Sequence, residues 1–325
     1  MLLAVVQLVA GVTALFVGGH YLVQGATRIA LFARISAAVV GLTIVAMGTS
    51  LPEMAVSVEA AARGSTDLAF ANIIGSSIFN IGAILGITAI VVPVAVKRRT
   101  IRVEYPFMFV VAAVVVLLCR DLSVDRVEGG FLFGALILFT VFVVYMSRRD
   151  VELDEAKSLE QDVRRAAKFK DGIGRAWSIS IVMVVLGIVA LIGGADLVVR
   201  GAVVIADAIG VDERVIGLTV VAMGTSLPEL ATSAVAALQG ERDIALANVI
   251  GSNLFNLLGV LGATALVFPV PLNPAARLDN WVMLGFCAAL YPLMLLGRRV
   301  SRADGVLLLG GLCIYVTYLI LTRGV

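Results

Sequence analysis

The chain has 325 residues, of which 60% are hydrophobic and 15% are charged, and its mean hydropathy is +1.04. A soluble domain of this size carries more charge, so the composition excludes that class and favours a polytopic helical membrane protein in a lipid bilayer. The formal net charge of +2 is too small to indicate a nucleic-acid partner, and the pattern identifies no protein partner.

Ten apolar segments reach the length of roughly 20 residues that crosses a bilayer as a helix. In chain order the expected spans are 2–29, 36–62, 68–94, 103–119, 128–147, 177–205, 213–239, 243–269, 280–297 and 304–322. Glycine, proline or polar residues interrupt the second, third, seventh and eighth, which is typical of broken or substrate-lining helices in transporters. The prediction is an all-α integral membrane protein with about ten transmembrane helices.

The chain also contains an internal repeat with a constant offset of 176 residues and no gaps. The segment GLTIVAMGTSLPEMAVSVEAAARG (41–64) aligns with GLTVVAMGTSLPELATSAVAALQG (217–240), and ANIIGSSIFN (71–80) aligns with ANVIGSNLFN (247–256). Matches of this length indicate a duplicated unit. Because each half holds five spans, an odd number, we expect the second copy to be inverted relative to the first, as in secondary transporters.

The repeats divide the chain into two predicted units and a linker. The first five-helix repeat covers 1–146 with its motif near 41–86, the linker covers 147–176, and the second repeat covers 177–325 with its motif near 217–262. Alternate loops, the linker among them, carry 18 of the 25 basic residues. By the positive-inside rule the linker is cytoplasmic, and both termini are predicted outside the cell (inner) membrane, which the chain crosses many times.

Both copies carry the hexapeptide GTSLPE inside an apolar span. Pro52 and Pro228 lack an N–H, so the carbonyl four residues earlier loses its helical partner and the helix is expected to break. A carbonyl freed in lipid is tolerated only where protein, water or an ion satisfies it. The carbonyls at 46–49 and 222–225 are therefore candidate cation ligands.

Glu53 and Glu229 end the two hexapeptides. A carboxylate at the midplane of a bilayer is costly unless it is compensated, and such residues mark ion or proton pathways. No basic residue in the core of any expected span is available to pair with them, so a purely structural role is disfavoured. Inverted repeats place their site at the interface of the two copies, which brings both glutamates together.

The next span of each copy carries polar residues four apart, which share one helix face. They are Asn72, Ser76 and Asn80 in the first copy and Asn248, Ser252 and Asn256 in the second. Hydrogen bonding between helices explains such residues when they are taken alone. Beside a glutamate and a broken helix they also suit an all-oxygen site for Ca²⁺, and no His or Cys ligand is at hand for a softer metal.

The paired motifs AMGTSLPE…ANIIGSSIFN and AMGTSLPE…ANVIGSNLFN resemble the two alpha repeats of the calcium/cation antiporter superfamily, and specifically its sodium/calcium exchanger family of the prokaryotic type. The resemblance covers both repeats and the ten-span layout. It implies a secondary-active antiporter, neither an enzyme nor dependent on a cofactor. In such a protein Na⁺ and Ca²⁺ compete for one midplane site that opens alternately to the two sides.

Matching motif positions supply the residues that this resemblance implies. The Ca²⁺ ligands would be Glu53, Glu229 and the carbonyls of Thr49 and Thr225. The overlapping Na⁺ sites would add Ala46, Ser50, Ser76, Ala222, Ser226 and Ser252. The family also implies that the glycine-rich first and sixth helices slide as a gate, and here these helices carry Gly18, Gly19, Gly193 and Gly194.

Two departures from the family motif bear on ion coupling. Asn80 and Asn256 are both amides, whereas characterised sodium/calcium exchangers often have Asp at the second position. Ser77 replaces the Asn of the usual Gly-Ser-Asn in the first copy. The residues leave three alternatives open, namely a cation/proton antiporter of the same superfamily, an intramembrane enzyme that uses the two carboxylates, and a channel.

Two further sets of residues occupy equivalent positions in the repeats. His20 is expected to be structural, and Asp196 is expected to pair with Arg200 on the same helix. Asp67 and Asp243 begin the third and eighth spans, where helix capping explains them about as well as ion recruitment does.

Overall fold

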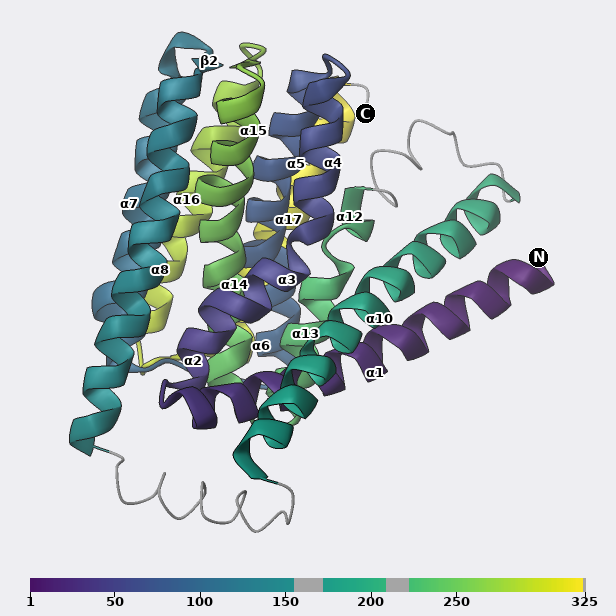
Figure 1. The fold of residues 1–325 in the computed structure, drawn as a ribbon. Coiled ribbons are helices and arrows are strands. Elements are labelled where there is room, and N and C mark those ends of the chain that lie inside the picture. Colours follow the sequence, from purple (N-terminus) through teal and green to yellow (C-terminus); the bar gives the residue numbers. More distant parts are fainter. Residues whose placement is uncertain (155–171, 209–221, 324–325) are drawn as a thin grey trace.

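The computed structural model describes residues 1–154, 172–208 and 222–323, which form a bundle of long helices (Figure 1). The elements of the first half are α1 (Leu2–Ala33), α2 (Ala37–Val40), η1 (Gly41–Val45), α3 (Ala46–Thr49), α4 (Leu51–Ala62), α5 (Thr66–Phe79), η2 (Asn80–Leu85), α6 (Gly86–Val91), β1 (Val94–Ala95), η3 (Thr100–Glu104), α7 (Tyr105–Leu118), η4 (Cys119–Asp121), β2 (Ser123–Val124) and α8 (Arg126–Asp154). Those of the second half are α10 (Gly172–Ala208), α12 (Ala222–Gly224), α13 (Leu227–Leu238), α14 (Arg242–Leu254), η6 (Phe255–Val260), α15 (Leu261–Val267), β3 (Val270–Pro271), α16 (Ala276–Leu295), β4 (Arg299–Val300) and α17 (Arg302–Arg323).

The membrane spans follow the expected order. Eight of the described helices are long and apolar enough to cross a membrane, and the bent pair formed by α2–α3 and α4 makes a ninth. The seventh expected span, 213–239, lies partly outside the described residues, and α12 and α13 are its described part. Part of the predicted linker also lies outside them.

The third and eighth spans, expected to be broken or substrate-lining helices, are not broken. Each is one continuous helix, Thr66–Val91 and Arg242–Val267, that contains a π-helical turn, η2 or η6. No proline interrupts their interiors, so the irregularity is absorbed as a widened turn instead of a break. These two helices form the centre of the bundle, because 78% and 100% of the residues in their most apolar stretches are buried.

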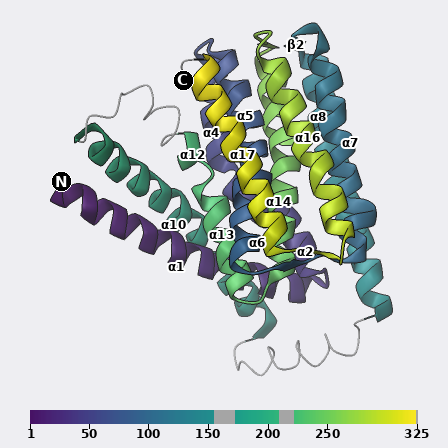
Figure 2. The same cartoon turned by 180° about the vertical axis from the view of Figure 1, so that it is seen from behind.

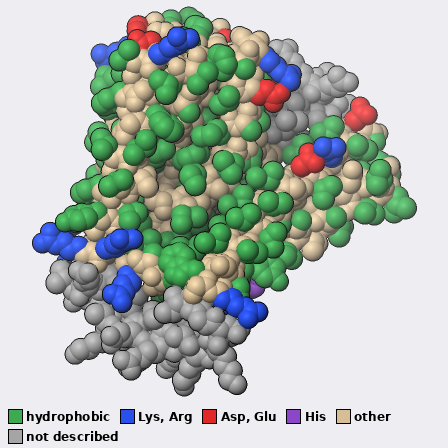
Figure 3. All heavy atoms as spheres, in the orientation of Figure 1, with side chains coloured by type: hydrophobic (Ala, Val, Ile, Leu, Met, Phe, Trp, Pro, Cys, Tyr) green, Lys and Arg blue, Asp and Glu red, His purple; other side chains and the backbone are tan. Residues whose placement is uncertain are grey.

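The outside of the bundle is apolar. Hydrophobic side chains cover most of the flank, and Lys, Arg, Asp and Glu lie mainly toward its ends (Figure 3). The outer helix α17 runs along the front in Figure 2. Only 17% of the residues in its most apolar stretch are buried. Such a surface is suited to lipid and not to water.

Two short antiparallel ladders join loops of one half to loops of the other. β1 pairs with β4, with Val94 opposite Val300, and β2 pairs with β3, with Val124 opposite Val270. The offset of 176 residues that relates the repeats also relates β1 to β3 and β2 to β4. The ladders are therefore equivalent features at opposite ends of the bundle.

An aspartate accompanies each ladder. Asp243 Oδ2 lies 2.8 Å from Lys97 Nζ, and Asp67 Oδ1 accepts a hydrogen bond of 2.9 Å from the Asn273 N–H. Lys97 and Asn273 are equivalent positions in the two repeats. Both aspartates lie in the first turn of their helices and not at the N-cap, so they tie the halves together and do not act as caps.

Loops that carry the excess of basic residues meet at one end of the bundle. There the Ser36 N–H donates to Ser147 Oγ (2.9 Å), and Arg99 Nη2 donates to the Val143 carbonyl (3.1 Å). The β1–β4 ladder lies at the same end. The described loops thus separate into the two groups that the distribution of Lys and Arg predicts.

The two longest helices, α1 and α10, lie side by side and antiparallel, inclined against the rest of the bundle (Figures 1 and 2). Small residues recur every seven positions along their contact: Ala4, Gly11, Gly18 and Gly25 on α1, and Ser180, Gly187, Gly194 and Gly201 on α10. A Cβ on Gly18 would lie 2.8 Å from the Gly187 carbonyl oxygen. The two backbones therefore touch, as small residues permit in membranes.

Adjacent glycines on α10 provide a direct test of this packing. A Cβ on Gly194 would lie 2.9 Å from the Gly11 carbonyl oxygen, whereas a Cβ on Gly193 meets nothing within 4 Å. We expect Gly194→Ala to destabilise the protein by about 1–3 kcal/mol through overpacking. Gly193→Ala should stabilise it by up to about 1 kcal/mol through helix propensity. The midpoint of thermal unfolding in detergent measures both, and equal shifts would contradict the packing.

Candidate functional site

The hexapeptide breaks its helix in the first half. α3 ends at Thr49 and α4 begins at Leu51, with a bend of 45° between the segments. The Ser50 N–H still donates to the Ala46 carbonyl (3.0 Å), and the carbonyls that follow lie at the break. Pro52 occupies the first turn of α4, where a missing N–H costs nothing.

The second half repeats this arrangement, with α12 ending at Gly224 and α13 beginning at Leu227. Glu53 and Glu229 consequently fall in the first turns of α4 and α13. The partial positive charge of a helix N-terminus favours a carboxylate there. The sequence thus folds each glutamate onto the start of a new helix inside the bundle.

Each glutamate is held by a serine of the other repeat. Ser50 Oγ donates to Glu229 Oε1 at 2.9 Å, and Ser226 Oγ donates to Glu53 Oε1 at 3.0 Å. All four side chains are buried, with 1% or less of their surface exposed. The structure therefore brings the two hexapeptides to one place, as the sequence predicts.

Neither carboxyl group has a positive partner among the described residues. Glu53 and Glu229 form no ion pair in the part of the chain that the structure describes. Two carboxylates buried without cationic side chains lose their hydration and repel each other. A bound cation, or protons, must balance them.

The first asparagine of each polar stripe supports the glutamate helix. Asn72 Nδ2 donates to the Glu53 carbonyl (3.2 Å) and to Ser57 Oγ (2.9 Å), and Asn248 Nδ2 donates to Ser233 Oγ (3.1 Å). These asparagines join helices, which is the alternative that the sequence left open. Sequence analysis missed the two serines, although they occupy equivalent repeat positions.

The last asparagines of the two stripes, Asn80 and Asn256, occupy equivalent repeat positions but differ in their contacts. Asn80 Nδ2 donates to Asn253 Oδ1 at 3.2 Å, whereas both amide atoms of Asn256 have no hydrogen-bond partner among the described residues. The position equivalent to Asn253 is Ser77, and its hydroxyl donates to the Ile73 carbonyl (2.9 Å). The departure at Ser77 therefore leaves the Asn256 amide buried and unpartnered.

Two of the remaining predicted residues are buried on the central helices α5 and α14. Ser252 is fully buried on α14, and its neighbour Gly251 would place a Cβ 2.7 Å from the Cβ of Ala46. Ser76 is buried on α5. Thr225 is half-buried between α12 and α13. Ala222 is the first residue of α12 and directly follows the segment 209–221, which the structure does not describe.

Several buried oxygens of these residues lack a hydrogen-bond partner in the described parts of the chain. They are Glu53 Oε2, Glu229 Oε2, Asn80 Oδ1, Asn256 Oδ1 and Ser252 Oγ. The segments that carry them adjoin, since η6 packs on α4 and η2 packs on α13. A bound ion would satisfy such orphaned oxygens, and carboxyl, amide and hydroxyl oxygens suit a hard cation.

Other metal chemistry finds no support in the described residues. They contain no group of three His, Cys, Asp or Glu side chains that could hold a metal ion. The donors at the break are oxygens of two carboxylates, hydroxyls, amides and backbone carbonyls. Such a set is typical of Na⁺ or Ca²⁺.

The chain is similar to known proteins over nearly its whole length. The model of the sodium/calcium exchanger protein family matches residues 3–145 and 179–321. A protein named CaxA from Alkalimonas amylolytica is 39% identical over 313 residues, which is 95% of this chain and 96% of that protein. The sodium/calcium exchanger MaX1 of Methanosarcina acetivorans is 29% identical over 340 residues, which is 96% of each chain.

A solved structure shares the fold. The sodium-calcium exchanger NCX_Mj superposes with a TM-score of 0.84 at 29% sequence identity, and the match covers 98% of this chain and 99% of that one. The two segments matched by the family model are themselves offset by 176 residues.

The asymmetry at Ser77 can be tested by restoring the missing amide. Ser77→Asn would offer Asn256 Nδ2 the acceptor that Asn253 offers Asn80, which fixes the Asn256 amide and leaves its Oδ1 open to a cation, as at Asn80. A ligand that is preorganised in this way should strengthen cation affinity by about three- to ten-fold. The affinity for Na⁺ and for Ca²⁺ can be measured by calorimetry on the purified protein.

Asn253→Ser is the reciprocal variant, since it removes the acceptor that fixes the Asn80 amide and should weaken cation affinity. Thermal unfolding of both variants would identify any loss of fold. Unchanged affinities for both ions in Ser77→Asn would exclude Asn256 as a ligand.

Proposed function

This chain belongs to the sodium/calcium exchanger protein family, and we propose that it exchanges Na⁺ for Ca²⁺ across the membrane at the centre formed by Glu53 and Glu229. Relatives that match nearly the whole chain are named sodium/calcium exchangers. The observation that carries the proposal is the reciprocal bonding of Ser50 to Glu229 and of Ser226 to Glu53, which leaves one oxygen of each carboxyl group unpartnered among the described residues.

The charge of the centre fits this exchange. Two carboxylates balance one Ca²⁺, and the same oxygens can hold Na⁺ ions in its place. We propose that the carbonyls of Thr49 and Thr225 complete the Ca²⁺ site. The Na⁺ sites would add Ala46, Ala222, Ser50, Ser226, Ser76 and Ser252, with the amides of Asn80 and Asn256 beside them. No cofactor takes part, because the ions are the substrates.

The alternatives are less well supported. A cation/proton antiporter of the same superfamily would carry a Gly-Asn-x-x-Glu motif around its acidic residue, whereas this chain has Thr-Ser-Leu-Pro-Glu. An intramembrane enzyme could use the two carboxylates with the hydroxyls of Ser50 and Ser226 beside them. A channel would need no counter-ion. The family that matches this chain is named for sodium/calcium exchange, which favours that exchange over all three alternatives.

We also propose how the chain lies in the membrane. The end of the bundle that holds the β1–β4 ladder carries most of the basic loops, so it faces the cytoplasm with the linker 147–176. Both termini then face the outside of the cell. The two repeats, 1–146 and 177–325, would cross the membrane in opposite directions, and the ion site would lie near its midplane.

The role of the glutamates is tested by removing one charge at a time. Glu53→Gln or Glu229→Gln leaves a single carboxylate to balance a divalent ion, so Na⁺-driven Ca²⁺ uptake into proteoliposomes should fall to near background. The fold should persist, because the amide keeps the volume and lowers the cost of burial. Glu59→Gln, on the same helix as Glu53 but exposed, is the control and should leave uptake unchanged. Robust uptake by either buried variant would place the site elsewhere.

Contacts around α1 and α10 differ between the two halves. His20 Nδ1, on α1, lies 2.9 Å from Gln239 Nε2 at the end of α13. The equivalent residues are Asp196 and Arg63, yet each forms an ion pair with a neighbour four residues away, as predicted for Asp196. α1 packs along α13, and no comparable packing joins α10 to α4 in the described residues.

Inverted repeats exchange their conformations when a transporter turns from one side to the other. In the opposite-facing state we therefore expect α10 to pack on α4. Asp196 would then reach Arg63, while His20 would separate from Gln239. Disulfide crosslinking can detect this exchange of contacts, with Arg63→Cys/Asp196→Cys compared with His20→Cys/Gln239→Cys.

The three native cysteines would first be replaced by alanine. Ion conditions that raise the crosslinking yield of one pair should lower the yield of the other. If both pairs rise and fall together, or the Arg63→Cys/Asp196→Cys pair never crosslinks, the exchange of contacts is refuted.

A further inference from the structure

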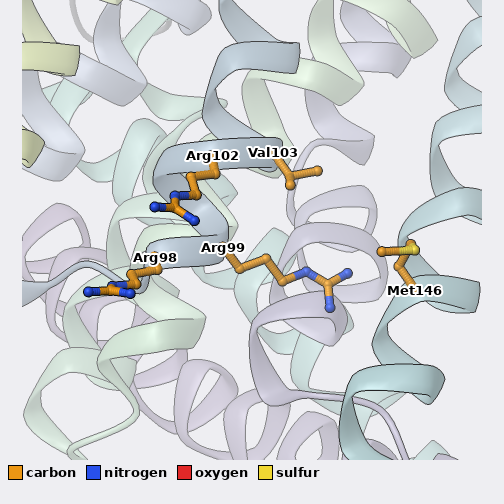
Figure 4. A pocket seen from close by; sticks show the side chains of 5 residues that line it. All are labelled: Arg98, Arg99, Arg102, Val103 and Met146. Atoms are coloured by element: carbon orange, nitrogen blue, oxygen red, sulfur yellow. The ribbon is translucent and has the colours of Figure 1, made fainter.

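A basic pocket lies between η3 and α8, away from the glutamates. Arg98, Arg99, Arg102, Val103 and Met146 line it, and its volume is about 260 Å³. In Figure 4, Arg98 and Arg102 extend to one side of η3, and Arg99 extends toward α8 and Met146. The pocket is smaller than a site for a drug-sized molecule, so it suits one small charged group.

One arginine of the pocket is fixed in place. Arg99 Nε lies 3.4 Å from Glu104 Oε1, and Arg99 Nη2 donates to the Val143 carbonyl at 3.1 Å. Glu104 is 1% exposed and also accepts from Thr100 Oγ1 at 2.8 Å. Arg99 is therefore a preorganised donor that links η3 to α8.

The other two arginines keep the pocket positive. Arg98 and Arg102 are exposed, four residues apart, and form no ion pair within the described residues. Like charges at this spacing repel on one helix face. Glu104 pairs with Arg99, and an anion that bridges Arg98 and Arg102 would relieve their repulsion.

The pocket lies at the level where the membrane meets water. η3 begins the span Thr100–Asp121, and Met146 lies close to the end of the span Arg126–Arg149. Val103 and Met146 give the pocket an apolar wall on the side of the helices. A ligand with a negative head and an apolar tail would satisfy both parts.

The second repeat shows that the fold does not need these arginines. The offset of 176 residues places Pro274, Ala275 and Leu278 at the equivalent positions, before and within α16. α16 begins at Ala276, the equivalent of Thr100 at the start of η3. The same corner is thus built at the other end of the bundle without these three arginines, although Arg277 lies within it.

We propose that this pocket binds the phosphate of an anionic phospholipid headgroup. Arginine guanidinium groups recognise phosphate oxygens through paired, charge-assisted hydrogen bonds. Basic pockets between membrane helices are suited to such headgroups. The phosphate is held at the rim of the pocket by Arg98 and Arg102, on the side of η3 away from Met146, and the acyl chains run from there into the bilayer.

Titration of the full chain in neutral detergent with phosphatidylglycerol, read by native mass spectrometry, tests the proposal. Arg98→Gln/Arg102→Gln should weaken phosphatidylglycerol binding by about ten-fold or more, because bonds to charged groups are lost. Arg98→Lys/Arg102→Lys keeps the charge but not the paired donors, so its binding should lie between the two. Arg148→Gln/Arg149→Gln removes the same charge from exposed positions at the same end of α8 and should bind as the unmodified chain does.

Two parallel titrations identify the source of the phosphate. Phosphatidylcholine should bind much more weakly than phosphatidylglycerol, and inorganic phosphate should not compete at millimolar concentration. Equal loss of binding in the Arg98/Arg102 and Arg148/Arg149 glutamine variants would reduce the effect to general surface charge. Full competition by inorganic phosphate would overturn the assignment to a lipid. Neither result depends on transport.

Discussion

A carboxylate buried in a membrane without a basic partner must obtain its hydrogen bonds from neutral donors, and this requirement organises the centre of the molecule. Ser50 and Ser226 supply those donors, each to the glutamate of the other repeat. Each serine lies at the break just before a new helix, so one proline in the first turn of each helix positions both serine and glutamate. The two halves complete one another, and neither forms the site alone.

Contacts between the halves are of two kinds, and they suit different roles. The ladders β1–β4 and β2–β3, with the partners of Asp243 and Asp67, hold the ends of the bundle through directional hydrogen bonds. α1 and α10 approach each other through glycine backbones, which hold the two helices together as a closely packed pair. The ladders and the central helices keep the oxygens of the site in register.

Much of this architecture is predictable from the sequence, because hydropathy determines the spans and proline determines the breaks. The repeat offset also predicts that Glu53 and Glu229 meet. Three features are not predictable. The π-helical turns η2 and η6 need no residue that lacks a backbone N–H, so nothing in the hydropathy or the proline positions indicates them. Ladders of two residues are too short to show a period, and the bond between Asn80 and Asn253 depends on how η2 rotates its first residue.

The central claim is that downhill movement of Na⁺ drives Ca²⁺ through the centre between the two glutamates. Proteoliposomes containing the unmodified chain, loaded with Na⁺ and diluted into Na⁺-free medium with radiolabelled Ca²⁺, measure this coupling directly. The account predicts rapid Ca²⁺ uptake that disappears when the Na⁺ concentration is equal on both sides. Uptake that ignores the Na⁺ gradient and follows a pH gradient, or that proceeds with no counter-ion gradient at all, would contradict it.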